Sequence, residues 1–271
     1  MITELVLIAG KGAYPIECAR SARAQGVKKI VAVAFKGETF KEISDVVDEV
    51  TWMFVGELST FRNAFKRFGI SHAVMVGQIT PSNLFNARLD KAMREMLSSL
   101  PRKNADTIFG AIGEDLKKLG VELLPAHQFM RENLVKAGML TREKPTAEQQ
   151  KDIQQGLELA KCCSKYQAGQ SVAIKQGTVI AVEGFEGTDK MIQRAGKVGG
   201  DGCVIVKVAQ QKHDMRWDIP VVGLNTVKQL KKAKCSCLAM EAGKVILLER
   251  EEVVRAAETA GICLMVMELN A

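Results

Sequence analysis

The sequence predicts an α/β protein with a Rossmann-like N-terminal domain built on a parallel sheet and a C-terminal α/β domain with a mixed sheet. The first observation is a continuous apolar run at 5–9, which leads into a glycine loop and an alanine-rich stretch. Such runs are typical of parallel strands that are covered on both faces. The second is the stretch 171–182, whose two β-rich halves meet at Gln176 and Gly177 and indicate a hairpin. The third is the length of 271 residues, which suits two domains of ordinary size.

The N-terminal half alternates between strand and helix patterns, as a βαβ architecture requires. Pro15 is well placed in the first turn of a helix that stops before Gly26, and Asn104 is a suitable N-cap for a later helix. The strands expected here are 5–9, 29–34, 50–54, 73–77 and 120–125, and the expected helices are 15–25, 59–68, 86–99 and 105–119.

A linker is expected within 135–147, where Gly138, Pro145 and mixed charges interrupt the regular patterns. The expected domains are therefore 1–138 and 139–271.

The C-terminal half is richer in β patterns. Thr146 begins a helix in capping-box style, Gly196 is expected to end a second helix, and Asn225 is expected to cap a third. The expected helices are 146–164, 189–195, 225–234 and 250–259, and the expected strands beyond the hairpin are 203–208, 237–241, 244–248 and 262–267.

Composition narrows the partners and the compartment. A formal net charge of +7 favours anionic partners, and an aromatic content of 5% is too low for a platform that stacks single-stranded nucleic acid, so no nucleic-acid partner is expected. No apolar run reaches the ~18 residues that span a bilayer. The N-terminal run lacks the cationic flank and cleavage site of a signal peptide. Seven cysteines without zinc-like spacing indicate the reducing cytoplasm.

The loop of Gly10, Lys11 and Gly12 lies between the first expected strand and the first expected helix. Its N–H groups and the helix N-terminus behind it suit a phosphate. The dinucleotide fingerprint is incomplete because Pro15 takes the third glycine position and no acid ends the second strand, which disfavours an NAD-dependent oxidoreductase. A tight turn with a purely structural role explains the same residues. Serine-hydrolase, P-loop and zincin motifs do not occur in the sequence.

The densest group of ionisable residues begins in the apolar run 203–208. Lys207 lies in that run, and Asp214, Arg216 and Asp218 follow it closely. Carboxylates mixed with cations suit a phosphate ester, because acids hold a divalent metal or position water while Arg and Lys neutralise phosphate oxygens. A polar loop with ordinary surface ion pairs is the alternative explanation.

Two further polar loops belong to this half. Gly169, Gln170 and Ser171 lead into the expected hairpin, and Glu186 and Asp189 flank a helix N-terminus, where carboxylates are stabilised. Together with the two aspartates of the preceding paragraph, these acids would supply a site for Mg²⁺ (or Mn²⁺), which keeps waters and binds substrate phosphate. Helix capping alone is the competing explanation for Glu186 and Asp189.

Five motifs carry a resemblance to a known family. In chain order they are Ala9-Gly-Lys-Gly-Ala-Tyr-Pro15, Ala168-Gly-Gln-Ser-Val172, Ala181-Val-Glu-Gly-Phe-Glu-Gly-Thr-Asp189, Val206-Lys-Val208 and His213-Asp-Met-Arg-Trp-Asp-Ile-Pro220. This ordered set resembles the LpxI family, the UDP-2,3-diacylglucosamine pyrophosphatases of lipid A biosynthesis. The chain departs from the family pattern at Gln167, where an acid is expected, and at Thr80-Pro81-Ser82, where Arg-Pro is expected.

The resemblance implies hydrolysis of a UDP-activated acylated glucosamine lipid to 2,3-diacylglucosamine 1-phosphate (lipid X) and UMP, assisted by Mg²⁺ (or Mn²⁺). It also implies two domains and a cytoplasmic location, and leaves open peripheral contact with the inner membrane and a homodimer. A non-catalytic binding protein for a phosphorylated lipid or nucleotide is the alternative function.

The resemblance and the residue chemistry together give the expected site. The catalytic aspartate falls in the stretch 214–218, with Asp214 preferred over Asp218. The expected catalytic residues are Asp214, Asp218 and Arg216; the expected substrate-binding residues are Gly10, Lys11, Gly12, Gly169, Gln170, Ser171, Thr188 and Lys207; and the expected metal ligands are Glu186, Asp189 and Asp214.

Overall fold

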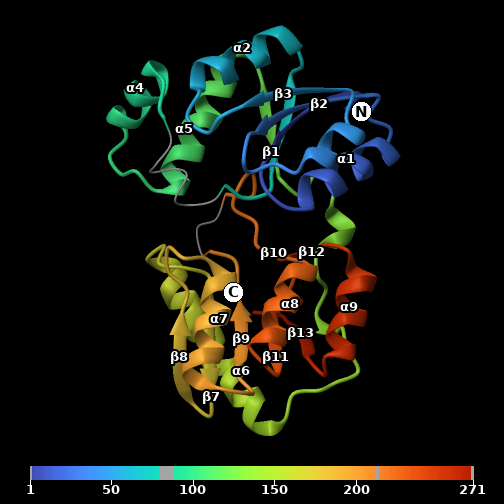
Figure 1. Ribbon diagram of the computed structural model, residues 1–271, viewed down its shortest axis with the longest axis vertical. Helices are drawn as coiled ribbons and strands as arrows, with labels where there is room; N and C mark the ends of the chain where they lie inside the picture. Colours follow the sequence, from blue (N-terminus) through green and yellow to red (C-terminus); the bar gives the residue numbers. More distant parts are fainter. Residues whose placement is uncertain (1, 80–87, 211–213, 270–271) are drawn as a thin grey trace. The chain divides into compact units, whose positions relative to one another are not determined.

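The structure is a computed structural model that describes residues 2–79, 88–210 and 214–269 (Figure 1). It divides the chain into two compact units. The first contains Met1–Met130 and Met215–Trp217, and the second contains Arg131–Asp214 and Asp218–Ala271.

The first unit contains a parallel sheet with the strand order β3-β2-β1-β4-β5. Its strands are β1 (Glu4–Ala9), β2 (Lys29–Phe35), β3 (Glu49–Met53), β4 (His72–Val76) and β5 (Glu122–Leu124). Its helices are α1 (Tyr14–Ala24), α2 (Leu58–Phe68), α4 (Lys91–Ser99) and α5 (Ala105–Lys118), with a 3₁₀ turn at Lys41–Asp45. The strand order reverses between β1 and β4, as in a doubly wound fold. The Rossmann-like prediction is confirmed.

Alternation along β1 explains how this sheet is buried on both faces. Val6 and Ile8 belong to one apolar cluster with Phe61 and Phe65 of α2 and with Leu116 of α5. Successive strand residues point to opposite faces, so the fully buried residues between them face the other layer. Helix α1 packs on β1 and β4. Asn104 caps α5 by accepting a hydrogen bond from the Thr107 N–H, as the sequence predicts.

The second unit contains a mixed sheet with the strand order β6-β13-β11-β9-β7-β8. Its strands are β6 (Gly138–Met139), β7 (Ser171–Lys175), β8 (Thr178–Val182), β9 (Val204–Lys207), β11 (Cys237–Glu241) and β13 (Cys263–Met267). A separate parallel pair is formed by β10 (Val221–Val222) and β12 (Ile246–Leu247). The helices are α6 (Ala147–Lys165), α7 (Thr188–Gly199), α8 (Leu224–Lys232) and α9 (Arg250–Thr259), with a 3₁₀ turn at Arg131–Asn133. Strands β9, β11 and β13 are mutually parallel, while β6, β7 and β8 run antiparallel to their neighbours, so the mixed-sheet prediction is confirmed.

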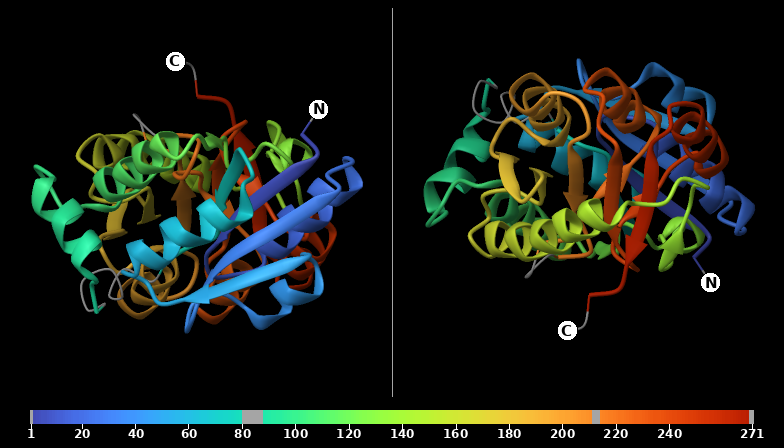
Figure 2. Two further views of the ribbon diagram at one scale, coloured as in Figure 1. Left: turned by 90° about the horizontal axis from the view of Figure 1, so that it is seen from above. Right: turned by 90° about the horizontal axis from the view of Figure 1, so that it is seen from below.

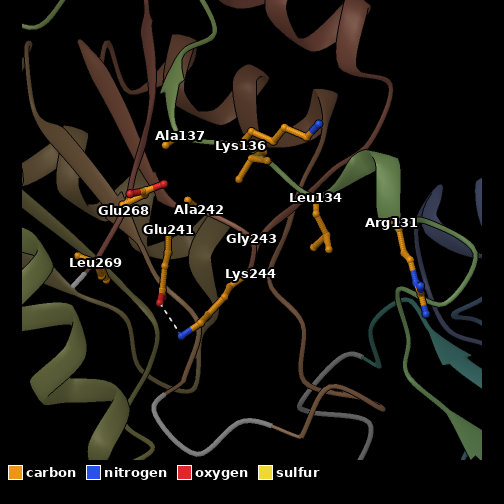
Figure 3. A pocket seen from close by; sticks show the side chains of 11 residues that line it. Arg131, Leu134, Lys136, Ala137, Glu241, Ala242, Gly243, Lys244, Glu268 and Leu269 are labelled. Atoms are coloured by element: carbon orange, nitrogen blue, oxygen red, sulfur yellow. Dashed lines mark ion pairs between the residues drawn. The ribbon is translucent and has the colours of Figure 1, made fainter. Parts of the chain in front are cut away.

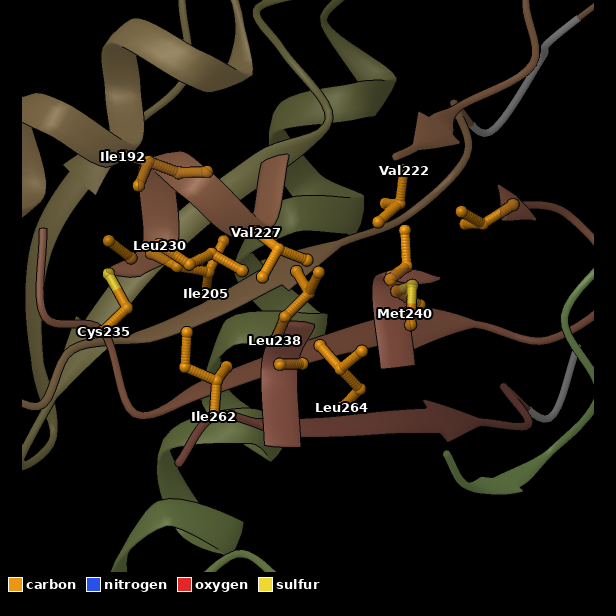
Figure 4. Close-up of a cluster of buried hydrophobic side chains, with 14 of the residues drawn as sticks. Ile192, Ile205, Val222, Val227, Leu230, Cys235, Leu238, Met240, Ile262 and Leu264 are labelled. Atoms are coloured by element: carbon orange, nitrogen blue, oxygen red, sulfur yellow. The ribbon is translucent and has the colours of Figure 1, made fainter. Parts of the chain in front are cut away.

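This second sheet lies between two helical layers (Figure 2). Helices α7, α8 and α9 share an apolar cluster with one face, in which Val227 and Leu230 lie near Ile205 and Leu238 (Figure 4). Helix α6 covers the other face, where its residues join a cluster with Val204 and Val206. Side chains at neighbouring positions of β9 therefore belong to different layers.

The predicted hairpin turn at Gln176 and Gly177 is confirmed. Both residues have positive φ angles, 51° and 73°, as a tight hairpin turn requires. Asp152 of α6 is buried and accepts hydrogen bonds from the N–H groups of Gln176 at 2.9 Å and Gly177 at 2.7 Å. This carboxylate fixes the hairpin tip to α6.

Two predicted helix ends in this unit are wrong for identifiable reasons. Helix α7 continues through Gly196 to Gly199. Position 196 is a glycine because a Cβ there would lie 2.7 Å from Cβ of Ala233. The glycine permits close packing and does not stop the helix. Gly223, not Asn225, is the N-cap of α8, and Asn225 lies within the first turn.

Three other boundaries differ. Helix α4 begins at Lys91 rather than 86, with 86–87 outside the described residues, and β12 is shorter than the expected strand 244–248. The division into units falls after Met130 rather than after 138. The reason is that Val135 exchanges backbone hydrogen bonds with the second unit through Val245 and Gly243.

Across the described parts of the chain, every helix is too short or too polar to cross a membrane.

A substitution tests the close packing of α6 on the sheet. Gly156 lies in α6, and a Cβ there would lie 2.5 Å from Cγ2 of Val206. We expect Gly156→Ala to lower the free energy of unfolding by about 1–3 kcal/mol, because the core is overpacked. Gly110→Ala in α5 is the control, since its nearest neighbours are atoms of Trp217 at 3.9 and 4.0 Å. That variant should be neutral or gain about 0.5–1 kcal/mol from helix propensity. Urea unfolding measures both, and equal effects of the two substitutions would contradict the packing argument.

Candidate active site

The candidate site lies at one edge of the second unit's sheet. Strands β8 and β9 end at this edge, and β7 begins there because it runs antiparallel to both. Ser171 is consequently the register partner of Lys207. Helix α7 starts from the same edge, directly after β8. Carboxyl ends of strands are the usual location of ligand sites in α/β folds.

Lys207 lies at the centre of a polar network at this edge. It is only 3% exposed, and its Nζ donates a hydrogen bond to Oγ1 of Thr188 at 3.0 Å. The Thr188 hydroxyl donates to the Glu183 carboxylate, at 3.1 Å from Oε1 and 3.2 Å from Oε2. Oγ of Ser171 lies 3.3 Å from the same hydroxyl. The expected residues Ser171, Thr188 and Lys207 are therefore brought together.

Burial lowers the pKa of the Lys207 ammonium below its ordinary value, and the carboxylates of Glu183, Asp189 and Asp218 oppose that shift. The structure thus places Asp218, one of the two candidate catalytic aspartates, within electrostatic range of Lys207. A buried cation surrounded by acids is the kind of perturbed group that marks functional sites in proteins.

Helices α7 and α8 both begin at a glycine N-cap. The N-caps of α7 and α8 are Gly187 and Gly223, and neither supplies a side-chain hydrogen bond. Asn225 links the two helix starts, because its Nδ2 donates to Oδ2 of Asp189 at 2.6 Å. Uncapped first-turn N–H groups, aided by the helix dipole, bind anions such as phosphate.

The loop before β7 is held close to the end of β8. A Cβ at Gly169 would clash with the backbone carbonyl of Glu183, so close approach explains this glycine. The backbone carbonyl of Gln170 accepts from the Val208 N–H at 2.9 Å, which joins the loop to the end of β9. Oε1 of Gln170 is buried and accepts no hydrogen bond from any residue that the structure describes.

The stretch 214–218 forms a turn in which the Asp218 N–H donates to the carbonyl of Asp214 at 2.8 Å. Its central residues belong to the first unit. There Trp217 donates from Nε1 to Oδ1 of Asp106 at 3.3 Å, and the Arg216 guanidinium lies 4.5 Å from the Trp217 ring centre. The catalytic role of Arg216 stays a prediction. Lys212 and His213 lie outside the described residues.

Gly10 and Lys11, in the first unit, use their N–H groups within the fold. The Gly10 N–H donates to the Val76 carbonyl at 2.8 Å, and the Lys11 N–H donates to the Gln78 carbonyl at 2.6 Å. A Cβ at Gly10 would lie 2.6 Å from the Gln78 oxygen, so backbone packing accounts for this glycine. A phosphate contact from this loop stays a prediction and would depend on Gly12 and the Lys11 side chain. The departure at Thr80-Pro81-Ser82 falls outside the described residues.

Comparison with known sequences decides the family. The sequence model of the LpxI N-terminal domain matches residues 4–133, and that of the LpxI C-terminal domain matches residues 136–265. The chain belongs to the LpxI family. The UDP-2,3-diacylglucosamine pyrophosphatase LpxI of Caulobacter vibrioides is 27% identical over 274 residues, which cover 96% of this chain and 95% of that protein.

Solved structures add little to this LpxI assignment. The alignment with a CobK precorrin-6A reductase covers 100% of this chain and 89% of the reductase chain, with 12% identity and a TM-score of 0.38. The alignment with the biotin carboxylase domain of a Hydrogenobacter thermophilus 2-oxoglutarate carboxylase covers 66% of this chain and 36% of that domain's chain, with 14% identity and a TM-score of 0.25. At such low TM-scores neither likeness carries an argument about fold or function.

Two of the expected metal ligands of this LpxI chain, Glu186 and Asp189, have different hydrogen-bond and ion-pair partners. Glu186 forms an ion pair with Arg194 through Oε1 and accepts from the Gly184 N–H at 3.2 Å through Oε2. The Arg194 guanidinium is the main cause of a lowered pKa at Glu186. Oδ2 of Asp189 accepts a hydrogen bond from Nδ2 of Asn225 at 2.6 Å. Among the described residues no three His, Cys, Asp or Glu side chains are grouped to hold a metal. Glu186 would have to leave Arg194 before it could hold a metal, and the metal-ligand roles of Asp189 and Asp214 stay predictions.

Sequence reasoning missed Glu183. It is 8% exposed, directly follows β8 and holds the Thr188 hydroxyl that contacts Lys207. An acid immediately after an apolar strand and before Gly184 was the available signal. Its partner Lys207 lies far along the chain, so only the fold reveals the pairing.

The charge on Lys207 should depend on Glu183. We expect Glu183→Gln to lower the pKa of Lys207 further, because a carboxylate that favours the ammonium is removed. NMR titration of ¹³C-labelled lysine in metal-free protein measures this. Glu186→Gln is the control, because Glu186 pairs with Arg194 and is not among the acids that act on Lys207. An unchanged Lys207 pKa in Glu183→Gln would contradict the network.

The same shift has a consequence for stability. The folded-state pKa of Lys207 lies below its ordinary value of 10.5, so the unfolded chain holds this proton more tightly. The free energy of unfolding should therefore rise with pH between the folded pKa and 10.5, and Lys207→Met should abolish this part of the pH dependence. Urea unfolding at a series of alkaline pH values checks the sign.

Proposed function

We propose that this chain hydrolyses the pyrophosphate of UDP-2,3-diacylglucosamine to 2,3-diacylglucosamine 1-phosphate (lipid X) and UMP, with the assistance of Mg²⁺ (or Mn²⁺). Membership of the LpxI family supports the reaction class. The observation that carries the proposal is the buried Lys207 ammonium, hydrogen-bonded to Thr188 at the uncapped start of α7.

The residues of this edge suit the charge of a diphosphate. Lys207 supplies a cation in a water-poor environment, where its attraction to phosphate oxygens is stronger than at the surface. The free N–H groups of α7 and α8 supply donors for further phosphate oxygens, and these donors are already oriented before substrate arrives. The unpaired Oε1 of Gln170 would accept a hydrogen bond from a substrate hydroxyl or amide.

The attacking water is assigned to the aspartates of the 214–218 turn. Asp218 already acts on the Lys207 ammonium, and the Asp218 N–H fixes the turn to Asp214. Either carboxylate can accept a proton from water as it attacks phosphorus. Asp189 and Asp214 would hold the divalent ion, with Glu186 joining only by leaving Arg194. When bound, such an ion neutralises phosphate charge and makes a bound water more acidic.

We further propose that the protein works in the cytoplasm and meets its lipid substrate at the inner membrane surface. The net charge of +7 suits anionic head groups.

The reaction is tested by incubating the purified chain with UDP-2,3-diacylglucosamine in the presence of Mg²⁺, Mn²⁺ or EDTA. We expect UMP and lipid X in equal amounts with either ion and a strong loss of turnover in EDTA. Reaction in ¹⁸O water then shows which phosphorus is attacked. Absence of UMP under every condition, with substrate still bound, would favour a non-catalytic binding protein instead.

Substitutions separate the roles of the two aspartates. We expect either Asp214→Asn or Asp218→Asn to lower kcat about 10²–10⁴-fold, the range for loss of a general base, and the other to have a smaller effect. Substrate binding should persist in both and can be measured by calorimetry without metal. Asp201→Asn is the matched control, because Asp201 forms an exposed ion pair with Lys234. Near-wild-type turnover in both Asp214 and Asp218 variants would refute this assignment.

A further inference from the structure

Glu241 is a buried acid at the same edge of the second sheet, on the opposite face from Lys207. It is the last residue of β11 and is 2% exposed. Its neighbour Met240 is the register partner of Lys207, so Glu241 lies one position further along the edge. Alternation along the strand places Glu241 on the α6 face, together with Ala239.

Three donors satisfy the Glu241 carboxylate. Oε2 accepts from Nζ of Lys161 at 2.7 Å and from the Ala209 N–H at 2.8 Å, and Oε1 accepts from Nζ of Lys244 at 2.9 Å. Burial disfavours ionisation of Glu241, but these three donors outweigh it and lower its pKa below the ordinary range. Glu241 is therefore a carboxylate at neutral pH.

Both backbone groups of Ala209, its N–H and its carbonyl, form hydrogen bonds with side chains. Its N–H is bound by Glu241, and its carbonyl accepts from Nζ of Lys161 at 3.2 Å. The residue before it, Val208, is bound to the Gln170 carbonyl. Ala209 lies between Lys207 and Asp214 in sequence, so this anchor fixes the direction in which the chain leaves β9.

The two lysines are not equivalent. Lys244 faces a cavity of about 680 Å³ lined also by Arg131, Lys136 and Glu268, and its side chain is 43% exposed (Figure 3). Lys161 is less exposed, at 28%, and contacts Ala209 as well as Glu241. Exposed ion pairs contribute little, so the Lys161 contact is the important one.

We infer that Glu241 is a positioning residue for the reaction: with Lys161 it clamps Ala209, and so holds the end of β9, where Lys207 lies two residues earlier in the chain. This inference rests on the proposed function for its effect on turnover. The clamp itself is a property of the fold and can be measured without substrate.

The test compares Glu241→Gln and Lys161→Met with Lys244→Met. Glutamine keeps the size of the side chain but removes the charge that holds both Lys161 and Ala209. Lys244→Met removes an ion pair from the same carboxylate without touching Ala209, which makes it the matched control. The readouts are hydrogen exchange at the Ala209 amide, kcat and KM for UMP release, and the urea midpoint of each variant.

In Glu241→Gln and Lys161→Met we expect Ala209 exchange to rise and kcat to fall by about ten-fold or more, the scale of a lost hydrogen bond to a charged group. KM should stay within about two-fold, because these residues hold the chain and do not bind substrate. Lys244→Met should resemble wild type. If Glu241→Gln does not fold, the double variant Lys161→Met/Glu241→Gln, which leaves only the more exposed Lys244 without its partner, should fold and still show fast Ala209 exchange.

Unchanged Ala209 exchange in Glu241→Gln would overturn the clamp. Faster exchange with unchanged kcat would overturn its role in positioning. A lower urea midpoint with faster exchange throughout β11 and β13 would mean a general structural role and would also overturn it. If the wild type releases no UMP, the proposed function fails, and the exchange rates alone decide whether Glu241 clamps Ala209.

Discussion

The buried side-chain amine of Lys207 at the end of β9 is the constraint on which this edge of the second unit depends. An unpaired charge there would cost several kcal/mol, so Lys207 requires acids and acceptors around it. Thr188 and Glu183 meet that requirement directly, while Asp189 and Asp218 contribute through their fields. These contacts join the start of α7 and the end of β8 to Lys207. Electrostatics and local fold are thus satisfied by one arrangement.

At this edge the two faces of the sheet carry different charged residues. Lys207 points toward the start of α7, where it contacts Thr188, and Glu241 points toward α6, where it contacts Lys161. Because β9 and β11 are adjacent and parallel, the two charged groups lie one residue apart in register without facing each other. One face therefore carries the lysine proposed to bind phosphate, while the other carries the proposed clamp on Ala209.

Local sequence signals predicted most of the fold. The capping box of Thr146 and Gln149, the N-cap Asn104 and the turn at Gly177 each act within a few residues and are confirmed. Signals that depend on distant neighbours failed. Gly196 resembles a helix-terminating glycine in the sequence, but it is needed for close packing against Ala233. Asn225 resembles an N-cap, but its side chain donates a hydrogen bond to Asp189.

The candidate site shows the same limit. The structure brings Ser171, Thr188 and Lys207 together because each begins or ends an element at the same edge of the sheet. Glu183 escaped notice because its importance arises from a lysine beyond the next helix. Arg216 lies over the Trp217 ring, and its expected role beside Asp214 stays a prediction.

The carboxylate of Asp152 has a consequence for how the second unit opens. It fastens the tip of the β7–β8 hairpin to α6, at the end of the hairpin remote from Ser171. Helix α6 packs on β9 as well, where Gly156 faces Val206. The hairpin tip is thus tied, through one helix, to the strand that carries Lys207. Loss of the Asp152 carboxylate would therefore release the hairpin tip, while the ladder between β7 and β9 still joins Ser171 to Lys207.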